Sequence, residues 1–223
     1  MKAISIDIDG TITDEERRID CRAIDAIRRL KMPVILATGN TVCFALTTAR
    51  LIGTDGIIIA ENGGVVKTCY DGEEYVLCDA TECERAFELL SKNFDLEKLD
   101  AEYRKTDVAL RRNFDLPSAR EILSKSNLKV DLVDSGFAIH IKNKHINKGV
   151  GLKKVAELLG WSTQDIGAIG DSESDIEMFN VAGFGVAVAN ADPKLKQIAT
   201  LVTKGEYGAG VAEAIETIER SFL

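Results

Sequence analysis

The sequence is poor in the residues that build zinc sites and disulfide frameworks. It holds only 2 histidines, and its 5 cysteines form no Cys-x-x-Cys pair. A zinc site needs several histidine or cysteine ligands at short spacing, and a disulfide framework needs an even number of paired cysteines. The sequence therefore predicts neither kind of site.

Excess positive charge and long apolar runs are also missing. With 36 acidic and 28 basic residues the formal net charge is −8, so the chain has no general basic field for nucleic acid. Apolar runs such as "GIIIA" are far shorter than the about 20 residues that a membrane-spanning helix needs, and no basic-then-apolar leader opens the chain. We therefore expect a cytoplasmic monomer or homodimer that acts on small molecules, with neither nucleic acid nor a membrane as partner.

The composition that remains is that of an ordinary folded protein. At 223 residues, with 45% apolar and 29% charged residues, the chain can form one large domain or two unequal ones. The charged run "DEERR" (residues 14–18) mixes its signs, which favours a solvated loop or helix start over a binding patch.

Two carboxylates stand at the end of the first apolar segment. In "KAISIDIDGT" (residues 2–11) apolar residues alternate up to Asp7 and Asp9, and Gly10 follows. Residues i and i+2 of a strand face the same side, so both carboxylates can point at one ligand or metal; the alternative is a solvated strand end. A calcium loop would also use both acids, but Ser5 stands at its first ligand position and too few residues precede it for a helix.

Strands and helices alternate in the first third of the chain. We expect strands over 2–7, 34–39 and 56–60, and helices over 20–32, with Asp20 as N-cap, and 41–53, closed by Gly53. Apolar strands separated by helices of this length indicate a parallel sheet that is buried on both faces.

The pattern changes after a hairpin signal at Asp71-Gly72. Residues 81–146 read as helix, strand, helix and two strands, which is an α+β unit with antiparallel pairing. The alternation then resumes, with a helix over 148–159, a strand over 166–170, a helix over 174–182, a strand over 185–188, a helix over 193–199 and a final helix from about 209. We therefore predict an α/β core from residues 1–80 and 147–223, and an inserted α+β domain from residues 81–146.

Polar residues follow nearly every predicted strand of the core. They are Asp7 to Thr11, Thr38 to Asn40, Glu61 to Gly64, Gly170 to Ser172, and Ala189 with Asn190. Ligands of parallel α/β sheets bind outside the carboxyl ends of the strands, so these groups are expected to converge on one site.

Four of these segments together resemble a known family. "DIDGT", "ATGN", "INKG" and "GDSESD", in this order, resemble the motifs of the haloacid dehalogenase-like (HAD) phosphatases, and the resemblance runs from Asp7 to about Asn190. It implies a Rossmann-like parallel-sheet core in which residues 81–146 form a cap of the C2 type. Within the family, the chain looks nearest to the small archaeal phosphoglycolate phosphatases.

The resemblance implies roles for the acidic residues. Asp7 would be the nucleophile that forms a phosphoaspartyl intermediate, and Asp9 would be the general acid and base. Mg²⁺ would be held by Asp7, Asp171 and the backbone carbonyl of Asp9, with Asp175 as a further ligand or an orienting residue. Family members often carry Asn where this chain has Ser174, which leaves open how Asp175 is held.

The resemblance also implies residues that bind the phosphate. Thr38 and Lys148 would contact its oxygens, and Gly10 and Gly39 would let the backbone come close. From the residues alone, two alternatives stay open: Thr38 caps the next helix, and Lys148 is a solvated lysine in a first turn. Asn62 and Asn190 are implied as supporting polar contacts.

The cap is expected to supply the contacts to the rest of the substrate. Its candidates are Arg104, Lys105, Arg111, Arg112, His140 and Lys142. Because arginine pairs with carboxylates through two parallel hydrogen bonds, Arg104 or Arg111 is expected to bind the carboxylate of a substrate such as phosphoglycolate.

The expected function is magnesium-dependent hydrolysis of a phosphate monoester, with 2-phosphoglycolate as the expected substrate. The alternatives are a phosphosugar phosphatase, a phosphomannomutase-type transferase, and a metal- or phosphate-binding protein without turnover. A dinucleotide-binding domain is disfavoured, because no G-x-G-x-x-G follows the first strand.

Overall fold

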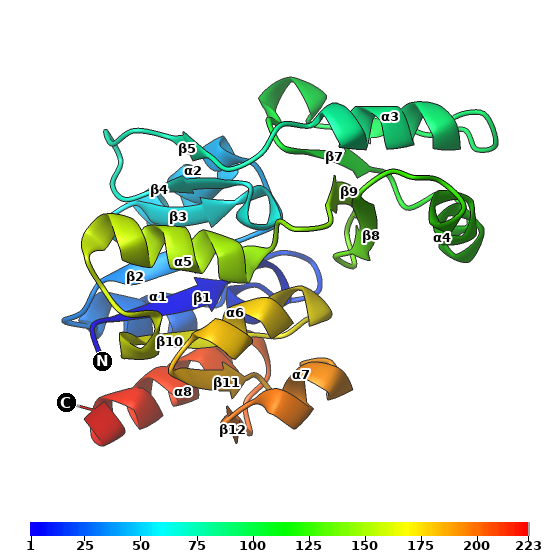
Figure 1. The fold of residues 1–223 in the computed structure, drawn as a ribbon. Coiled ribbons are helices and arrows are strands. Elements are labelled where there is room, and N and C mark those ends of the chain that lie inside the picture. Colours follow the sequence, from blue (N-terminus) through cyan, green and yellow to red (C-terminus); the bar gives the residue numbers. More distant parts are fainter. Residues whose placement is uncertain (223) are drawn as a thin grey trace.

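The computed structural model describes residues 1–222, which form two sheets (Figure 1). The larger sheet has eight strands in the order β12-β11-β10-β1-β2-β3-β4-β5. Its strands are β1 (Ala3–Asp7), β2 (Val34–Ala37), β3 (Ile57–Ala60), β4 (Val65–Lys67), β5 (Tyr75–Val76), β10 (Ile166–Gly170), β11 (Phe184–Ala187) and β12 (Leu201–Val202).

The pairing of the larger sheet is parallel from β12 to β3, and antiparallel only for β4 and β5. Every residue of β1, β2 and β3 is buried, as the continuous apolar runs predicted. The hairpin expected at Asp71-Gly72 is confirmed by the β4–β5 pair. The two-residue edge strand β12 was not predicted, because so short a segment leaves no periodic pattern in the sequence.

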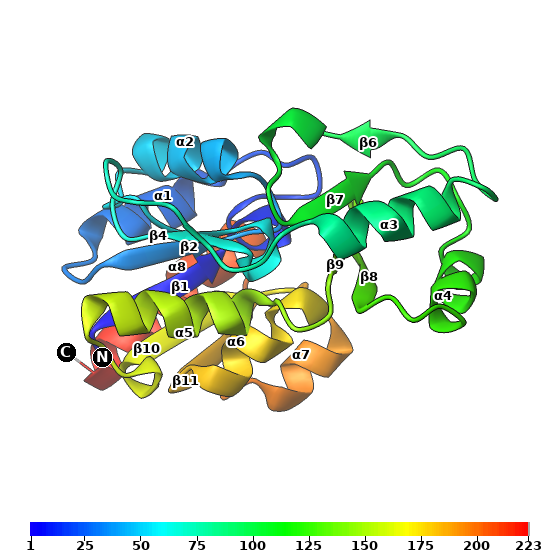
Figure 2. The same cartoon turned by 45° about the horizontal axis from the view of Figure 1, so that its top comes forward.

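Helices cover both faces of this sheet (Figures 1 and 2). One face carries α1 (Cys21–Arg29), α2 (Val42–Ile52) and α8 (Tyr207–Phe222), and the other carries α5 (Lys148–Leu159), α6 (Ile176–Val181) and α7 (Pro193–Ile198). The predicted ends of two helices are confirmed: the Asp20 side chain accepts a hydrogen bond from the backbone of Arg22, and Gly53 ends α2 at φ 94°. In residues 1–222 no helix combines the length and the apolar character needed to cross a membrane.

The smaller sheet lies beyond the carboxyl ends of the core strands (Figures 1 and 2). It is antiparallel, with the order β6-β7-β9-β8, and α3 (Thr81–Leu90) and α4 (Leu116–Ser124) pack against it. Its strands are β6 (Lys98–Leu99), β7 (Asp107–Leu110), β8 (Val130–Asp134) and β9 (Ile139–Asn143). Only β6 was not predicted.

Each sheet has its own hydrophobic core. Leu90, Leu110 and Ile141 belong to a cluster that contains only residues of the smaller sheet and its two helices, whereas Ile6 and Ile59 belong to the larger cluster. These separate cores support our proposal that residues 81–146 form a cap domain over a core of residues 1–80 and 147–223.

Candidate active site

Asp7 is the last residue of β1 and lies against the end of β10. It is 4% exposed, and the tight turn Ile8–Ile12 follows it. Gly10 in this turn has φ 81°, and a Cβ there would lie 2.5 Å from Asp171 Oδ2. Thr11 Oγ1 donates to Asp171 Oδ1 over 2.8 Å. Only glycine fits at this position. The turn after β1 is thus bonded to Asp171, the residue that follows the neighbouring strand β10.

Lys148 lies between two buried carboxylates. Its side chain is 2% exposed, and Nζ donates to Asp7 Oδ1 over 2.5 Å and to Asp175 Oδ1 over 2.6 Å. Burial disfavours its charge, but Asp175 and Asp7 raise the pKa of Lys148 above its usual value, so the ammonium stays charged. The alternative that Lys148 is a solvated lysine is therefore wrong.

Asp175 is held at both of its oxygens. Oδ1 accepts from Lys148, and Oδ2 accepts from the backbone N–H groups of Asp171 and Ser172, each over 3.1 Å. Ser174 Oγ bonds only the hydroxyl of Ser172, at 2.8 Å. Asp175 is thus oriented without an asparagine at position 174.

Asp9 lies on the turn after Asp7 and is bonded from three sides. Its Oδ2 accepts from Asn40 Nδ2 over 2.5 Å and from Thr38 Oγ1 over 3.3 Å, and its Oδ1 accepts from Arg17 Nε over 2.8 Å. Thr38 does not cap α2, whose N-cap residue is Thr41. The capping alternative for Thr38 is therefore wrong. The calcium-loop alternative is also wrong, because a strand that ends at Asp7 stands where that loop needs an entering helix.

A cavity of about 80 Å³ lies between these residues and the cap. The core lines it with Asp7, Asp9, Arg17, Gly39, Asn40, Asn62, Lys148, Ser172 and Ser174, and the cap with Leu99, Asp100, Arg104, Ala109, Ser135, Phe137, Ala138 and His140. A larger groove of about 960 Å³ between α4, β8 and the core shares Asn62, Lys148 and Ser174 with it. The cap therefore encloses the carboxylates with a small set of residues, half of them polar.

The haloacid dehalogenase-like hydrolase family has a sequence model that matches residues 4–113 and 118–215. The chain belongs to this family. It is 54% identical over 215 residues to the phosphoglycolate phosphatase of Archaeoglobus fulgidus, which covers 96% of each chain. It is also 54% identical over 218 residues to that of Methanosarcina acetivorans, covering 98% of this chain and 96% of the relative. The crystal structure of Thermoplasma acidophilum 0175 shares the fold, with a TM-score of 0.89 at 24% identity over 98% of each chain.

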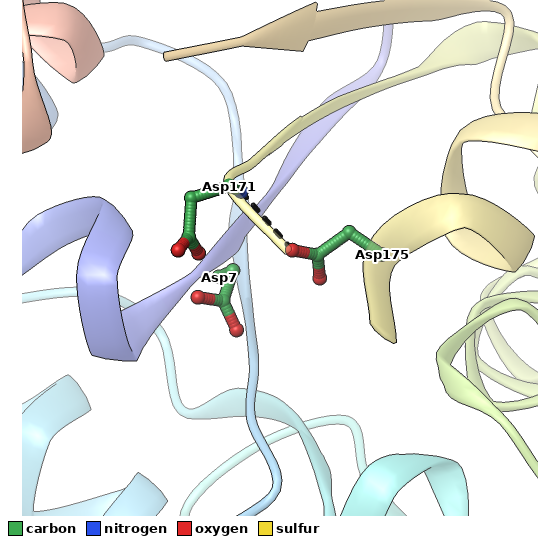
Figure 3. Close-up of side chains that lie close together, drawn as sticks. All are labelled: Asp7, Asp171 and Asp175. Carbon is green, nitrogen blue, oxygen red and sulfur yellow. Dashed lines mark hydrogen bonds between the residues drawn. The ribbon is translucent and has the colours of Figure 1, made fainter. Parts of the chain in front are cut away.

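The carboxylates of this HAD hydrolase fit a divalent cation. Asp7, Asp171 and Asp175 each place one oxygen within 4.8 Å of the others (Figure 3). Burial raises the pKa of Asp7 well above its usual value despite Lys148, and burial and Asp175 raise that of Asp171. Two buried carboxylates and the half-buried Asp171 beside one lysine need further positive charge, and oxygen ligands suit Mg²⁺.

Arg104 is the cap arginine that the structure places in the site. Its side chain is 4% exposed, and Nη1 donates to Asp107 Oδ1 over 2.7 Å and to the carbonyl of Gly39 over 3.2 Å. Nε is buried without a partner. Asp107 also accepts from Asn62 and contacts His140 Nδ1 at 3.0 Å. Arg104 therefore lines the cavity with a guanidinium that keeps one N–H group unpaired.

The structure does not bring Arg111 or Asn190 to the cavity. Arg111 is bonded through Nε and Nη2 to Glu97, and its side chain is 58% exposed. Asn190 donates to the carbonyl of Gly10 over 2.8 Å and accepts from the backbone of Tyr207 over 2.7 Å, so its amide holds the turn after β1. The expectations that these two residues contact substrate are corrected accordingly, whereas Gly39 and Asn62 do line the cavity.

Glu61 joins the core to the start of β7. This fully buried carboxylate accepts from the backbone of Lys105 over 2.9 Å, and from the backbone and the hydroxyl of Thr106, each over 2.8 Å. Burial raises its pKa, although these bonds oppose the shift. These bonds fix the segment that carries Arg104 and leads into β7 relative to the end of β3.

Two site residues were missed from the sequence. Asp107 gave no signal, because a single acid in an apolar strand is common, and only its contacts with His140 on the neighbouring strand β9 and with Arg104 reveal its role. Arg17 belongs to the mixed-sign run that favoured a solvated loop, but it contacts Asp9.

Proposed function

We propose that this protein is a magnesium-dependent phosphatase that hydrolyses 2-phosphoglycolate through a phosphoaspartyl intermediate. The observation that carries the proposal is the buried pair of Asp7 and Lys148, with Asp9 on the following turn, in a cavity closed by a cap arginine. The relatives at 54% identity that are named phosphoglycolate phosphatase support the choice of substrate.

Asp7 acts as the nucleophile, and Asp9 transfers the protons. An oxygen of Asp7 attacks phosphorus, the bond from phosphorus to the leaving oxygen breaks, and Asp9 donates its proton to the glycolate oxygen. Asp9 then takes a proton from water, whose oxygen attacks the phosphoaspartate, and phosphate leaves with the Asp7 carboxylate restored. Lys148 and Thr38 donate to phosphoryl oxygens as charge develops on them.

The residues that would hold magnesium are Asp7, Asp171 and the backbone carbonyl of Asp9, with Asp175 fixing the arrangement through Lys148. When bound, the ion supplies positive charge against the phosphate and the carboxylates.

The cap supports an acidic leaving group. Arg104 lines the cavity, and its guanidinium keeps an N–H group without a partner, which is a donor for the carboxylate of glycolate. This arginine favours phosphoglycolate over the phosphosugar alternative, because a sugar phosphate carries no carboxylate.

The proposed function is tested by phosphate release with and without Mg²⁺ from phosphoglycolate, several sugar phosphates and an aryl phosphate. We expect magnesium-dependent release that is fastest with phosphoglycolate. Preference for a sugar phosphate would overturn the substrate assignment, and transfer of phosphate to a second sugar would indicate a transferase. Absence of release from every substrate would favour a binding protein.

Magnesium is expected to stabilise the fold by binding the acidic cluster. At 100 times its dissociation constant a ligand adds about 2.7 kcal/mol, which for a chain of this size raises the melting temperature by roughly 5–10 °C. Asp171→Asn should remove most of this shift, whereas the exposed Asp25→Asn should keep it. Differential scanning calorimetry in EDTA and in Mg²⁺ measures both, and an unchanged shift in Asp171→Asn would exclude that residue as a ligand.

Arg104 is expected to select for the substrate carboxylate. Arg104→Lys keeps a positive charge beside Asp107 but removes the planar fork. Since hydrogen bonds between charged groups contribute about 1.5–3 kcal/mol, kcat/KM for phosphoglycolate should fall roughly 10- to 100-fold. With 2-hydroxyethyl phosphate, which lacks the carboxylate, it should change little.

The matched control for Arg104 is Arg111→Lys, since Arg111 also belongs to the cap and its side chain pairs only with Glu97. It should leave both substrates unaffected. Equal losses on both substrates in Arg104→Lys would show that Arg104 does not bind the carboxylate.

A further inference from the structure

Arg17 is held in a fixed conformation by a short loop between β1 and α1. Its φ is 62°, an uncommon value for a residue with a side chain, and its backbone N–H donates to the carbonyl of Asp14 over 3.0 Å. A bridge between Thr13 and Ile19 closes the loop. The next residue, Arg18, has a side chain that is 70% exposed and pairs with Asp14 and Glu16. The loop thus directs one arginine to the site and the other to solvent.

The guanidinium of Arg17 bonds Asp9 and lies near one aromatic ring of the core and one of the cap. Nε donates to Asp9 Oδ1 over 2.8 Å, and Nη2 donates to Asn40 Oδ1 over 3.3 Å. Its Cζ lies 5.4 Å from the ring centre of Phe44 in the core and 5.1 Å from that of Phe137. Phe137 belongs to the cap, in the turn between β8 and β9, and both distances are within the range of cation–π attraction.

We propose that Arg17 is a positioning residue that couples cap closure to the orientation of Asp9. This inference rests on the proposed function, in which Asp9 protonates the leaving group. When the Phe137 ring lies against the guanidinium, Arg17 is fixed and holds Asp9 Oδ1, while Asn40 and Thr38 hold Oδ2. When the β8–β9 turn moves away, Arg17 loses one of its two aromatic contacts and Asp9 loses a fixed partner.

Such coupling has a clear chemical use. A closed cap excludes water and brings the cap residues to the leaving group, so proton donation is useful only in that state. Arg17 ties the acid to closure because it contacts Asp9 and the cap at once. It touches no reacting atom in this arrangement, and it acts through Asp9.

The test compares three substrates by kcat/KM, which reports the steps up to leaving-group release. Phosphoglycolate and 2-hydroxyethyl phosphate have poor alkoxide leaving groups that need the acid, whereas p-nitrophenyl phosphate has a good one that does not. Arg17→Ala should lower kcat/KM at least tenfold for both alkyl phosphates and less than about twofold for the aryl phosphate. The neighbouring Arg18→Ala should change none of the three.

Phe137 provides the second arm of the test. Phe137→Leu should lower kcat/KM for the alkyl phosphates about threefold. Phe137→Tyr should keep the wild-type value of kcat/KM, because it retains the ring that contacts Arg17. In the Arg17→Ala background Phe137→Leu should have no further effect, since the two residues act as one unit.

Several results would overturn the coupling. Equal losses on all three substrates would make Arg17 a phosphate-binding or structural residue, and a loss confined to phosphoglycolate would make it the carboxylate ligand. Additive effects of Arg17→Ala and Phe137→Leu would show that the ring does not act through Arg17. If the wild-type protein releases phosphate from none of the substrates, the proposed function itself fails, and this inference fails with it.

Discussion

Asp7→Asn is expected to lower turnover at least about 10³-fold, because the amide cannot form the phosphoaspartyl intermediate. The fold should persist. Asp7 is buried at the end of β1 with its pKa raised by burial, so the neutral amide relieves an unfavourable charge while Lys148 keeps Asp175 as its partner. Circular dichroism and a melting curve check the fold, and phosphate release checks activity.

Detection of the phosphoaspartyl intermediate provides a second test of Asp7 as the nucleophile. Wild-type protein quenched with acid during turnover should carry an acyl phosphate that hydroxylamine removes, and Asp7→Asn should carry none. Asp9→Asn retains the nucleophile and is the control, because it can still accept phosphate from an aryl ester. Wild-type activity in Asp7→Asn, or a hydroxylamine-sensitive phosphate on it, would refute the assignment of the nucleophile.

Lys148→Met is expected to have the largest effect on stability. The substitution leaves Asp7 and Asp175 facing each other without their shared cation, in a place where Lys148 is only 2% exposed. Breaking a buried ion pair in this way costs about 3–5 kcal/mol. Turnover should fall as well, because the ammonium no longer donates to the phosphoryl oxygens.

Urea unfolding in EDTA measures the change in the free energy of unfolding without a contribution from metal. The control is Lys153→Met on the same helix, α5, where the side chain is exposed. That variant should change stability by no more than about 0.5 kcal/mol. A similarly small change for Lys148→Met would show that the fold does not depend on the lysine between the two carboxylates.

Much of the fold was predictable because its signals are local and periodic. The helix over Lys148–Leu159 was predicted at its observed bounds, and the order of helices and longer strands in core and cap was confirmed. Two-residue strands such as β6 and β12 were missed, since so short a pairing depends on a neighbouring strand rather than on its own sequence.

The convergence of Asp7, Thr38 and Asp171 could also be predicted, whereas Lys148 follows no core strand and was implied only by the family resemblance. Parallel strands end at one edge of their sheet, so polar residues that follow each strand must meet there. The family resemblance then gave the motif residues their expected roles. What the sequence alone determined is therefore the core, its catalytic edge and the presence of an inserted cap.

The tertiary structure decided which side chains of the cap and loops reach that edge. Arg104 and Arg111 are equivalent candidates in the sequence, but Arg104 is buried beside Asp107 and Arg111 is exposed beside Glu97. Arg17 and Arg18 are neighbours, and only the left-handed backbone at Arg17 sends its side chain to Asp9 and Phe137. These choices depend on contacts between segments far apart in the chain, whose geometry no local pattern encodes.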